Sequence, residues 1–341
     1  MISLKGYNSF LSAQGNNCDA LTQAGIIRFK SLKFVYFIYY FFSMIFPFFL
    51  KRKIVKKNTK IAVCWSKRHS HVIDFQDSDS FFLNRKVDFV DILSLDFLTR
   101  VDVFRFVLKA RKHELKFMER FIYTVEFFCL KNIVSDYAEI SIAGHFDRFT
   151  ISLIFLSKSE EKKVTVFQHG AFGNIEGLTP LFVDKFYYLY PSSIPFIQKY
   201  FLCDDLEQSP VKEEDFDRIE HGLDLPDSIL FIGQDINPHF NEMILNALVG
   251  CYGKEQVYFL KHPRDRNVYK NGILISDCIR NPSLIVTRYS TLGFNYERLG
   301  HKVIYVDMDN VFVDFLNHNK NVISFDDLEK KISRVQLNNA N

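Results

Sequence analysis

Three short polar motifs follow predicted β-strands, and their residue types suit chemistry on a phosphate or a hydroxyl. They are Gln168-His169-Gly170, Lys261-His262-Pro263 and Ser290-Thr291-Leu292-Gly293. In open parallel sheets, ligands bind beyond the carboxyl ends of the strands. All three motifs are therefore candidate parts of a binding site.

The motif Lys261-His262-Pro263 places an ammonium group and an imidazole at a predicted sheet edge, where they can hold a phosphate. The proline lacks an N–H group and fixes the turn. When a sugar leaves its nucleotide, the phosphate gains negative charge, so a positioned donor stabilises the transition state more than the ground state. Standing alone, the motif would rather indicate a turn with an exposed histidine.

Residues 287–299 lead from a predicted strand into a predicted helix. The first N–H groups of such a helix, together with the hydroxyls of Ser290 and Thr291, form an anion site. Glu297, further along the helix, can accept hydrogen bonds from ribose hydroxyls. The alternatives are that Ser290 only caps the helix, with Gly293 in place of a capping-box glutamate, and that Glu297 is a solvated helix residue.

An inverting sugar transfer needs a general base for the acceptor hydroxyl. His169 is our first candidate, because the intrinsic pKa of histidine, about 6.5, suits the role. Asp147 and His145, in the loop 144–147, and Asp136 are reserve candidates that lie near another predicted strand. Their alternative roles are a loop-capping aspartate and a surface histidine.

Two further residues beside predicted strands, Gln234 and Gly170, complete the donor-binding candidates. The full set is Lys261, His262, Pro263, Ser290, Thr291, Gly293, Glu297, Gln234 and Gly170. No Asp-x-Asp motif follows a strand convincingly in the first half, so metal-dependent transfer is not indicated. We expect no metal and no other cofactor, with Lys261 and helix dipoles supplying the positive charge.

The 341 residues alternate short apolar runs with longer helical periods, which predicts βα units and an α/β fold with parallel sheets. We expect strands at 60–65, 87–95, 139–143, 164–167, 228–233, 256–260, 284–287 and 302–306, and helices within 101–130, 241–250 and 291–299. The acidic stretch 204–227 suggests a linker. The predicted organisation is a leader over 1–58, an acceptor domain over 59–205, a linker over 206–227 and a nucleotide-sugar donor domain over 228–341.

The ordered set Q-H-G, K-H-P and S-T-L-G-F-x-x-E-x-x-G-H-K-V, within residues 160–306, resembles bacterial transferases that share an HP motif. These are sialyltransferases, polysialyltransferases and capsule Kdo transferases and, more distantly, the CDP-glycerol polymerases of teichoic acid synthesis. The resemblance implies a GT-B fold, with two Rossmann-like domains facing across a cleft. It also implies that His262, Ser290 and Thr291 bind the phosphate of a cytidine-nucleotide donor.

One motif departs from this pattern. Polysialyltransferases are expected to show an acidic pair before the glycine, where this chain has Gln168-His169-Gly170, and the CDP-glycerol branch usually shows Trp-His-Gly. The identity of the base and the choice among CMP-sialic acid, CMP-Kdo and CDP-glycerol therefore remain open at this point.

The first 60 residues carry ten Lys or Arg and one acid, Asp19, while the remaining residues sum to a net charge of −6. Residues 34–50 contain no charge, include Tyr36, Tyr39 and Tyr40, and are flanked by lysines and Arg52. This favours a segment lying on an anionic membrane surface, with a buried helix or a true span as alternatives. We expect a peripheral protein at the cytoplasmic face of a bacterial plasma membrane, with no nucleic-acid partner.

Together these observations predict a glycosyltransferase of bacterial surface polysaccharide synthesis that uses a CMP-sugar and a lipid-linked or oligosaccharide acceptor. Other readings are a Kdo transferase, a CDP-glycerol glycerophosphotransferase, a sugar-nucleotide epimerase, and a non-catalytic membrane-bound glycan assembly protein. A basic, aromatic leader suits an enzyme with a lipid-linked acceptor better than it suits an epimerase.

Overall fold

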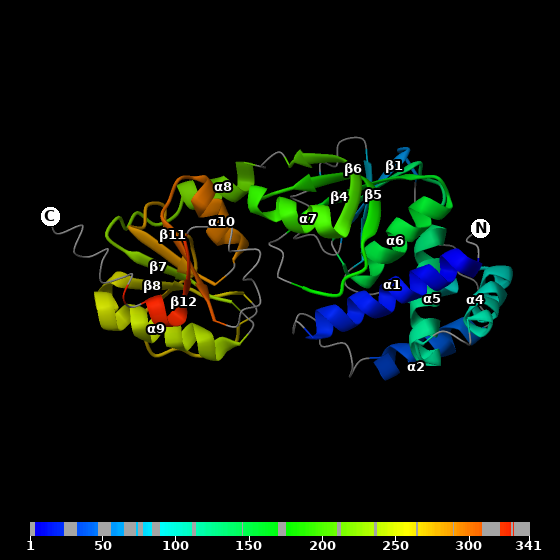
Figure 1. Ribbon diagram of the computed structural model, residues 1–341, viewed down its shortest axis with the longest axis horizontal. Coiled ribbons are helices and arrows are strands. Elements are labelled where there is room, and N and C mark those ends of the chain that lie inside the picture. Colours follow the sequence, from blue (N-terminus) through cyan, green and yellow to red (C-terminus); the bar gives the residue numbers. More distant parts are fainter. Residues whose placement is uncertain are drawn as a thin grey trace. The chain divides into compact units, whose positions relative to one another are not determined.

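The computed structural model describes residues 4–23, 33–46, 56–64, 73, 78–83, 89–110, 114–144, 146–169, 175–209, 213–234, 237–263, 265–288, 290–308, 321–328 and 330 (Figure 1). The chain divides into two compact units. The first comprises Met1–His169, Ile175–Leu189 and Phe196–Ser209, and the second comprises Gly170–Asn174, Tyr190–Pro195 and Pro210–Asn341.

The first unit is built around a six-stranded parallel sheet with the strand order β2-β1-β3-β4-β5-β6. In register, Cys64, Ala143 and Phe167 lie side by side at the ends of β1, β3 and β4, so the loops that follow leave from the same edge. The strands are β1 Lys60–Cys64, β2 Ser78–Phe82, β3 Glu139–Ala143, β4 Lys163–Phe167, β5 Leu181–Tyr188 and β6 Phe201–Gln208.

Helix α5 (Phe117–Val134) is the centre of the helical layer of this unit. It is buried without interruption from Arg120 to Leu130, as expected for a helix that is covered on all sides. The helices α1, α2, α3, α4 and α6 pack against it. Their bounds are α1 Leu4–Gln23, α2 Lys33–Ile45, α3 Phe89–Leu93, α4 Phe97–Lys109 and α6 Arg148–Ser159, and η2 Pro191–Ser193 and α7 Ile194–Tyr200 follow later in the chain.

The two N-terminal helices are folded parts of the first unit. Tyr7 of α1 is fully buried, and its hydroxyl lies 2.6 Å from Oγ1 of Thr124 on α5. On α2, Tyr40 and Met44 are buried, whereas Phe34 and Phe42 are exposed. No helix in the described ranges combines the length and the apolar character that a membrane span requires.

The second unit contains a second six-stranded parallel sheet, with the strand order β12-β11-β10-β7-β8-β9. Its central strands β7 and β10 are buried at every position, and α9 packs on β8. The elements are α8 Glu213–Glu220, β7 Ile229–Ile232, α9 Pro238–Tyr252, η3 Lys254–Gln256, β8 Val257–Leu260, β9 Ile273–Ile275, β10 Leu284–Thr287, α10 Thr291–Arg298, β11 Val303–Asp307 and β12 Val322–Ser324.

The predicted α/β class with two Rossmann-like parallel sheets is confirmed. One element prediction is wrong: residues 87–95, expected to form a strand, contain the short helix α3. A short apolar run does not distinguish a buried strand from a buried helix.

The acidic stretch 204–227, expected to be a linker, contains the end of β6 and helix α8. Three of its carboxylates lie on β6, and two of these, Asp205 and Glu207, bind Nζ of Lys185 on β5 at 3.1 and 2.8 Å. The charges that suggest a linker are thus cross-strand partners on an edge strand, a common place for charged side chains.

Candidate functional site

The polar motifs of the second unit converge at the carboxyl edge of its sheet. Thr287 of β10, Ile232 of β7 and Leu260 of β8 lie side by side at the ends of three neighbouring strands. The residues after them are Arg288, Gly233 and Lys261. Since neighbouring strands lie about 4.8 Å apart, the outer two strand ends are about 10 Å from each other, a span that a nucleotide can bridge.

Helix α10 begins shortly after the carboxyl end of β10. Ser290 is its N-cap, with Oγ accepting a hydrogen bond of 3.2 Å from the N–H of Leu292. Gly293 makes the close approach possible, because a Cβ there would lie 2.7 Å from Cγ2 of Thr287. Ser290 therefore has the capping role, and the positive end of the helix dipole lies at the same edge as Lys261.

The loop after β8 is held in place by its own residues. Nζ of Lys261 donates to the carbonyl of Asn267 at 2.8 Å, and the N–H of Asp265 donates to the carbonyl of His262 at 2.9 Å. His262 is half-buried and Pro263 is exposed in the turn. The loop thus has a defined shape at the sheet edge.

Asp265 is the buried centre of this loop, and it was not among the candidates from the sequence. Its Oδ2 accepts hydrogen bonds from the Tyr269 hydroxyl at 2.5 Å and Nδ2 of Asn241 at 3.3 Å, and its Oδ1 accepts two from Asn267. Burial raises the pKa of Asp265, but the hydrogen bonds from Tyr269 and Asn267 outweigh it, so the pKa is lowered. The same burial, with the bond to Asp265, raises the pKa of Tyr269 to about 12.

Asn241, on α9, joins this loop to the one after β7. Its Nδ2 donates to the carbonyl of Gln234 at 2.6 Å, while its Oδ1 accepts from the N–H of Gln234 at 3.2 Å. Because Asn241 also binds Asp265, the two loops share one buried amide. Gln234 itself is buried, with 8% of its surface exposed.

Arg288 is a second residue that the sequence did not single out. It directly follows β10, is only 1% exposed, and its guanidinium carbon lies 4.8 Å from the centre of the Phe240 ring. The signal in the sequence was the run Thr287-Arg288, which places an arginine directly after a predicted buried strand. Arginine is rarely buried without a specific role. With Lys261, it makes this edge cationic.

The side chain of Glu297 is half-buried in the second unit. Its Oε2 accepts a hydrogen bond of 2.9 Å from the Tyr305 hydroxyl, and burial together with this carboxylate raises the pKa of Tyr305. The ring of Phe294 lies between Tyr190 and Tyr305, with ring centres 4.5 and 5.0 Å away. This aromatic stack fixes the orientation of α10.

At the edge of the first sheet, the motif after β4 has one structural and one candidate chemical residue. Gln168 is fully buried, and its Oε1 accepts a hydrogen bond of 2.8 Å from the N–H of Leu189, beyond β5. His169 follows it and is half-buried at the carboxyl edge. Gly170 lies outside the described residues, as does His145.

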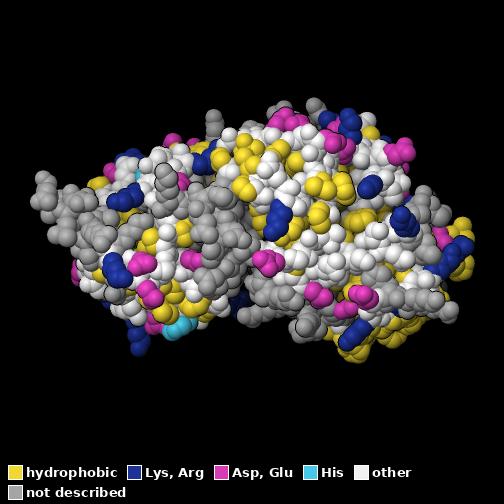
Figure 2. Space-filling view, in the orientation of Figure 1, with side chains coloured by type: hydrophobic (Ala, Val, Ile, Leu, Met, Phe, Trp, Pro, Cys, Tyr) yellow, Lys and Arg dark blue, Asp and Glu magenta, His cyan; other side chains and the backbone are white. Residues whose placement is uncertain are grey.

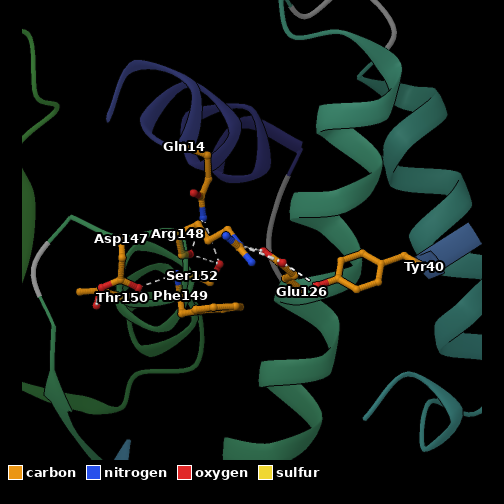
Figure 3. Close-up of polar contacts among 8 residues, drawn as sticks. All are labelled: Gln14, Tyr40, Glu126, Asp147, Arg148, Phe149, Thr150 and Ser152. Atoms are coloured by element: carbon orange, nitrogen blue, oxygen red, sulfur yellow. Dashed lines mark hydrogen bonds and ion pairs between the residues drawn. The ribbon is translucent and has the colours of Figure 1, made fainter. Parts of the chain in front are cut away.

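Asp147 has a local role, which Figure 3 shows. Its Oδ1 accepts from the N–H groups of Phe149 and Thr150 at 3.0 and 3.1 Å, and its Oδ2 accepts from the Thr150 hydroxyl at 2.6 Å. It is the N-cap of α6. Asp136, the other reserve candidate, lies in the turn before β3, at the amino edge of the sheet, whereas His169 follows β4 at the carboxyl edge.

Behind Asp147 lies a buried ion pair that joins four helices (Figure 3). Nε of Arg148 on α6 binds both carboxylate oxygens of Glu126 on α5, at 2.9 and 2.7 Å. The Tyr40 hydroxyl of α2 donates to Glu126 at 2.7 Å, and Gln14 of α1 donates to the Arg148 carbonyl at 2.7 Å. Burial raises the pKa of Glu126 despite the arginine. This cluster holds α1 and α2 to the first unit.

Among the described residues, no group of three or more His, Cys, Asp or Glu side chains is placed to hold a metal ion. The groups at the edge of the second sheet are instead cations, an imidazole and a helix N-terminus, which is chemistry suited to a phosphate.

No known protein family matches the chain, and no curated protein matches it. Among solved structures, it is similar to the UDP-GlcNAc 2-epimerase from Methanocaldococcus jannaschii, with a TM-score of 0.41 and 10% identity over 81% of this chain and 91% of that chain. A likeness of this degree carries no argument about activity. The fold assignment rests on the two parallel sheets themselves.

Proposed function

We propose that the protein is a glycosyltransferase that takes a sugar from a cytidine-nucleotide donor, in the first instance CMP-sialic acid, and transfers it to a glycan hydroxyl in bacterial surface polysaccharide synthesis. One observation supports it most: three neighbouring strands of the second sheet end in Lys261-His262, Gln234 and Arg288 with the start of α10. This arrangement suits the phosphate of a nucleotide.

In the proposed reaction, the acceptor oxygen attacks the anomeric carbon while the bond from that carbon to the phosphate oxygen breaks. The electron pair of that bond goes to the CMP phosphate, where His262, Arg288 and the α10 dipole stabilise the charge that develops. The acceptor proton goes to His169, the base in this proposal. The positive charge comes from side chains and the helix, so no metal is needed.

The proposal assigns the second unit to the donor and the first unit, through His169, to a lipid-linked or oligosaccharide acceptor. A thermal-shift screen of the full chain against CMP, CDP, UDP and GDP tests the donor assignment, because a ligand that binds only the folded state raises the melting temperature. We expect the largest shift with CMP. A larger shift with UDP or GDP would contradict a cytidine donor, and one with CDP would favour the glycerol-phosphate reading.

Turnover is tested separately, by release of CMP from CMP-sialic acid and from CMP-Kdo in the presence of an oligosaccharide acceptor. Release of CMP from CMP-Kdo but not from CMP-sialic acid would indicate a Kdo transferase. CMP binding with no turnover of either donor would favour the non-catalytic assembly protein.

A further inference from the structure

Two adjacent helices of the first unit expose apolar side chains along one face each. On α2 the exposed positions are 34, 35, 38, 42, 45 and, just after the helix, 46; on α4 they are 97, 98, 101, 105, 108 and 109. The two sets have the same spacing, and at 100° per residue each covers about 120° of its helix. Each set is thus a single stripe.

The α2 stripe is wholly apolar, and the α4 stripe is apolar with two cations. We define the α2–α4 face by its ten exposed apolar residues: Phe34 (60% exposed), Val35 (59%), Ile38 (38%), Phe42 (67%), Ile45 (57%), Phe46 (45%), Phe97 (77%), Leu98 (76%), Val101 (46%) and Leu108 (61%). Figure 2 shows hydrophobic side chains gathered at the margin of the molecule that carries these helices. So many exposed apolar residues on one face indicate an interaction surface.

The two stripes form one surface, because the helices are joined where α2 ends. The guanidinium of Arg100, on α4, donates from Nη1 to the carbonyl of Met44 at 3.2 Å and also to that of Phe46. The ring centres of Phe41 and Phe104, which are both half-buried, lie 6.4 Å apart. On the inner side, Tyr40 is bound to the buried Glu126, so the outer side of α2 is held in place.

We infer that the α2–α4 face docks on an anionic lipid bilayer. The exposed positions of α2 and α4 include two cations, Arg105 and Lys109, while Asp102, the one acidic residue of these two helices, is half-exposed. These two cations border a shallow hollow lined by Val101, Phe104 and Leu108. Three more cations follow α2 in the sequence, at residues 51, 52 and 53. Apolar side chains flanked by Lys and Arg are the pattern of interfacial membrane helices.

The charge pattern disfavours a second copy of the chain as the occupant. A two-fold interface places the same patch on both partners. It would bring Arg105 and Lys109 of both copies to one interface, where the half-exposed Asp102 is the one carboxylate of these two helices, so positive charge would remain in excess. The inference deepens the proposed function, since a lipid-linked acceptor lies at a membrane, but vesicle binding and CMP binding are measured separately and can fail separately.

The test is co-sedimentation of the full chain with vesicles of phosphatidylcholine alone or mixed with phosphatidylglycerol. We expect binding to the mixed vesicles, weakened about tenfold or more in the double variant Phe97→Ser/Leu98→Ser, because two apolar side chains no longer enter the bilayer. The double variant Arg105→Gln/Lys109→Gln should lose about fivefold per cation on mixed vesicles only. Both pairs are exposed, so the fold should be retained.

The control is Val268→Ser/Leu274→Ser in the second unit, where the side chains are 93% and 64% exposed. It should bind vesicles like the unchanged chain. The inference is overturned if the chain stays in solution with mixed vesicles, or if Phe97→Ser/Leu98→Ser binds as well as the control. It is also overturned if the chain is a dimer that this variant converts to a monomer, since the face would then be a protein interface.

Discussion

The carboxyl edges of the two sheets both carry polar residues but use them differently. At the first sheet, Gln168 binds the backbone beyond β5 and Asp147 caps α6, so the chain itself occupies both side chains. At the second sheet, the buried Asp265 and Asn241 hold the loops that carry Lys261 and Gln234. At the first edge, His169 remains the candidate for a chemical role, while the second edge offers a set of cationic groups.

This difference shows how to weigh polar residues that follow a strand. Asp147 binds groups only two and three residues away, which is the pattern of a helix cap. Asp265 also binds locally, but through Asn241 it connects to a different loop. A residue that positions other loops supports a site even when it does not touch a ligand.

The most direct test of this difference between the two edges is to remove one histidine from each. His169→Ala should lower kcat by about 10²–10⁴-fold and leave CMP affinity nearly unchanged, because it removes a general base and no donor contact.

His262→Ala should weaken CMP binding about tenfold to a hundredfold and lower turnover with it, since it removes a hydrogen bond to a charged group. Calorimetric titration with CMP and initial-rate kinetics measure both effects. Full activity in both variants would show that neither edge is the site.

The next prediction concerns Asp147, whose observed role is to cap helix α6. Asp147→Ala should lower the free energy of unfolding by about 0.5–2 kcal/mol, because the N–H groups at the start of α6 lose their acceptor. Asp147→Ser keeps a capping oxygen and removes the carboxylate, so it should restore most of the stability and leave turnover intact. Urea unfolding and initial rates measure these effects. A stable Asp147→Ser protein without turnover would make Asp147 the base in place of His169.

The smallest expected effect is the pH dependence that Asp265 contributes at the second edge. Its folded pKa is lowered below the unfolded value of about 3.9, so it stabilises the fold above that pH and loses this contribution as the pH falls through the folded pKa. Asp265→Asn should therefore be less stable than the unchanged chain at neutral pH, with a difference that shrinks below about pH 4. Urea unfolding at a series of pH values measures it. A difference independent of pH would mean that the carboxylate charge is not what holds this loop.

Much of the fold could be predicted from the sequence, because the buried strands of a parallel sheet are short apolar runs. The strands 139–143 and 284–287 have the predicted bounds. Strand β6 was missed because it lies at an edge and carries Asp204, Asp205 and Glu207. Helix α1 was missed because its buried Gln14 and Asn17 give it a polar appearance.

The candidate site was predictable only where its residues stand in short motifs. Lys261, His262, Ser290 and Gly293 lie at one sheet edge, as strand order requires. Asp265, Asn241 and Arg288 act through burial and through contacts between loops, which residue spacing does not reveal. Asp147 illustrates the reverse case, because capping and catalysis call for the same carboxylate after a strand.

The course of the chain between the units has a consequence for dividing the protein into fragments. Residues Tyr190–Pro195 belong to the second unit, although the segments on both sides of them belong to the first. A fragment that starts at Pro210 would lack Tyr190, whose ring covers Phe294 of α10. Expression of the second unit alone would thus expose the aromatic ring of Phe294 on the proposed phosphate-binding helix, and weak nucleotide binding by that fragment would reflect the cut and not the intact protein.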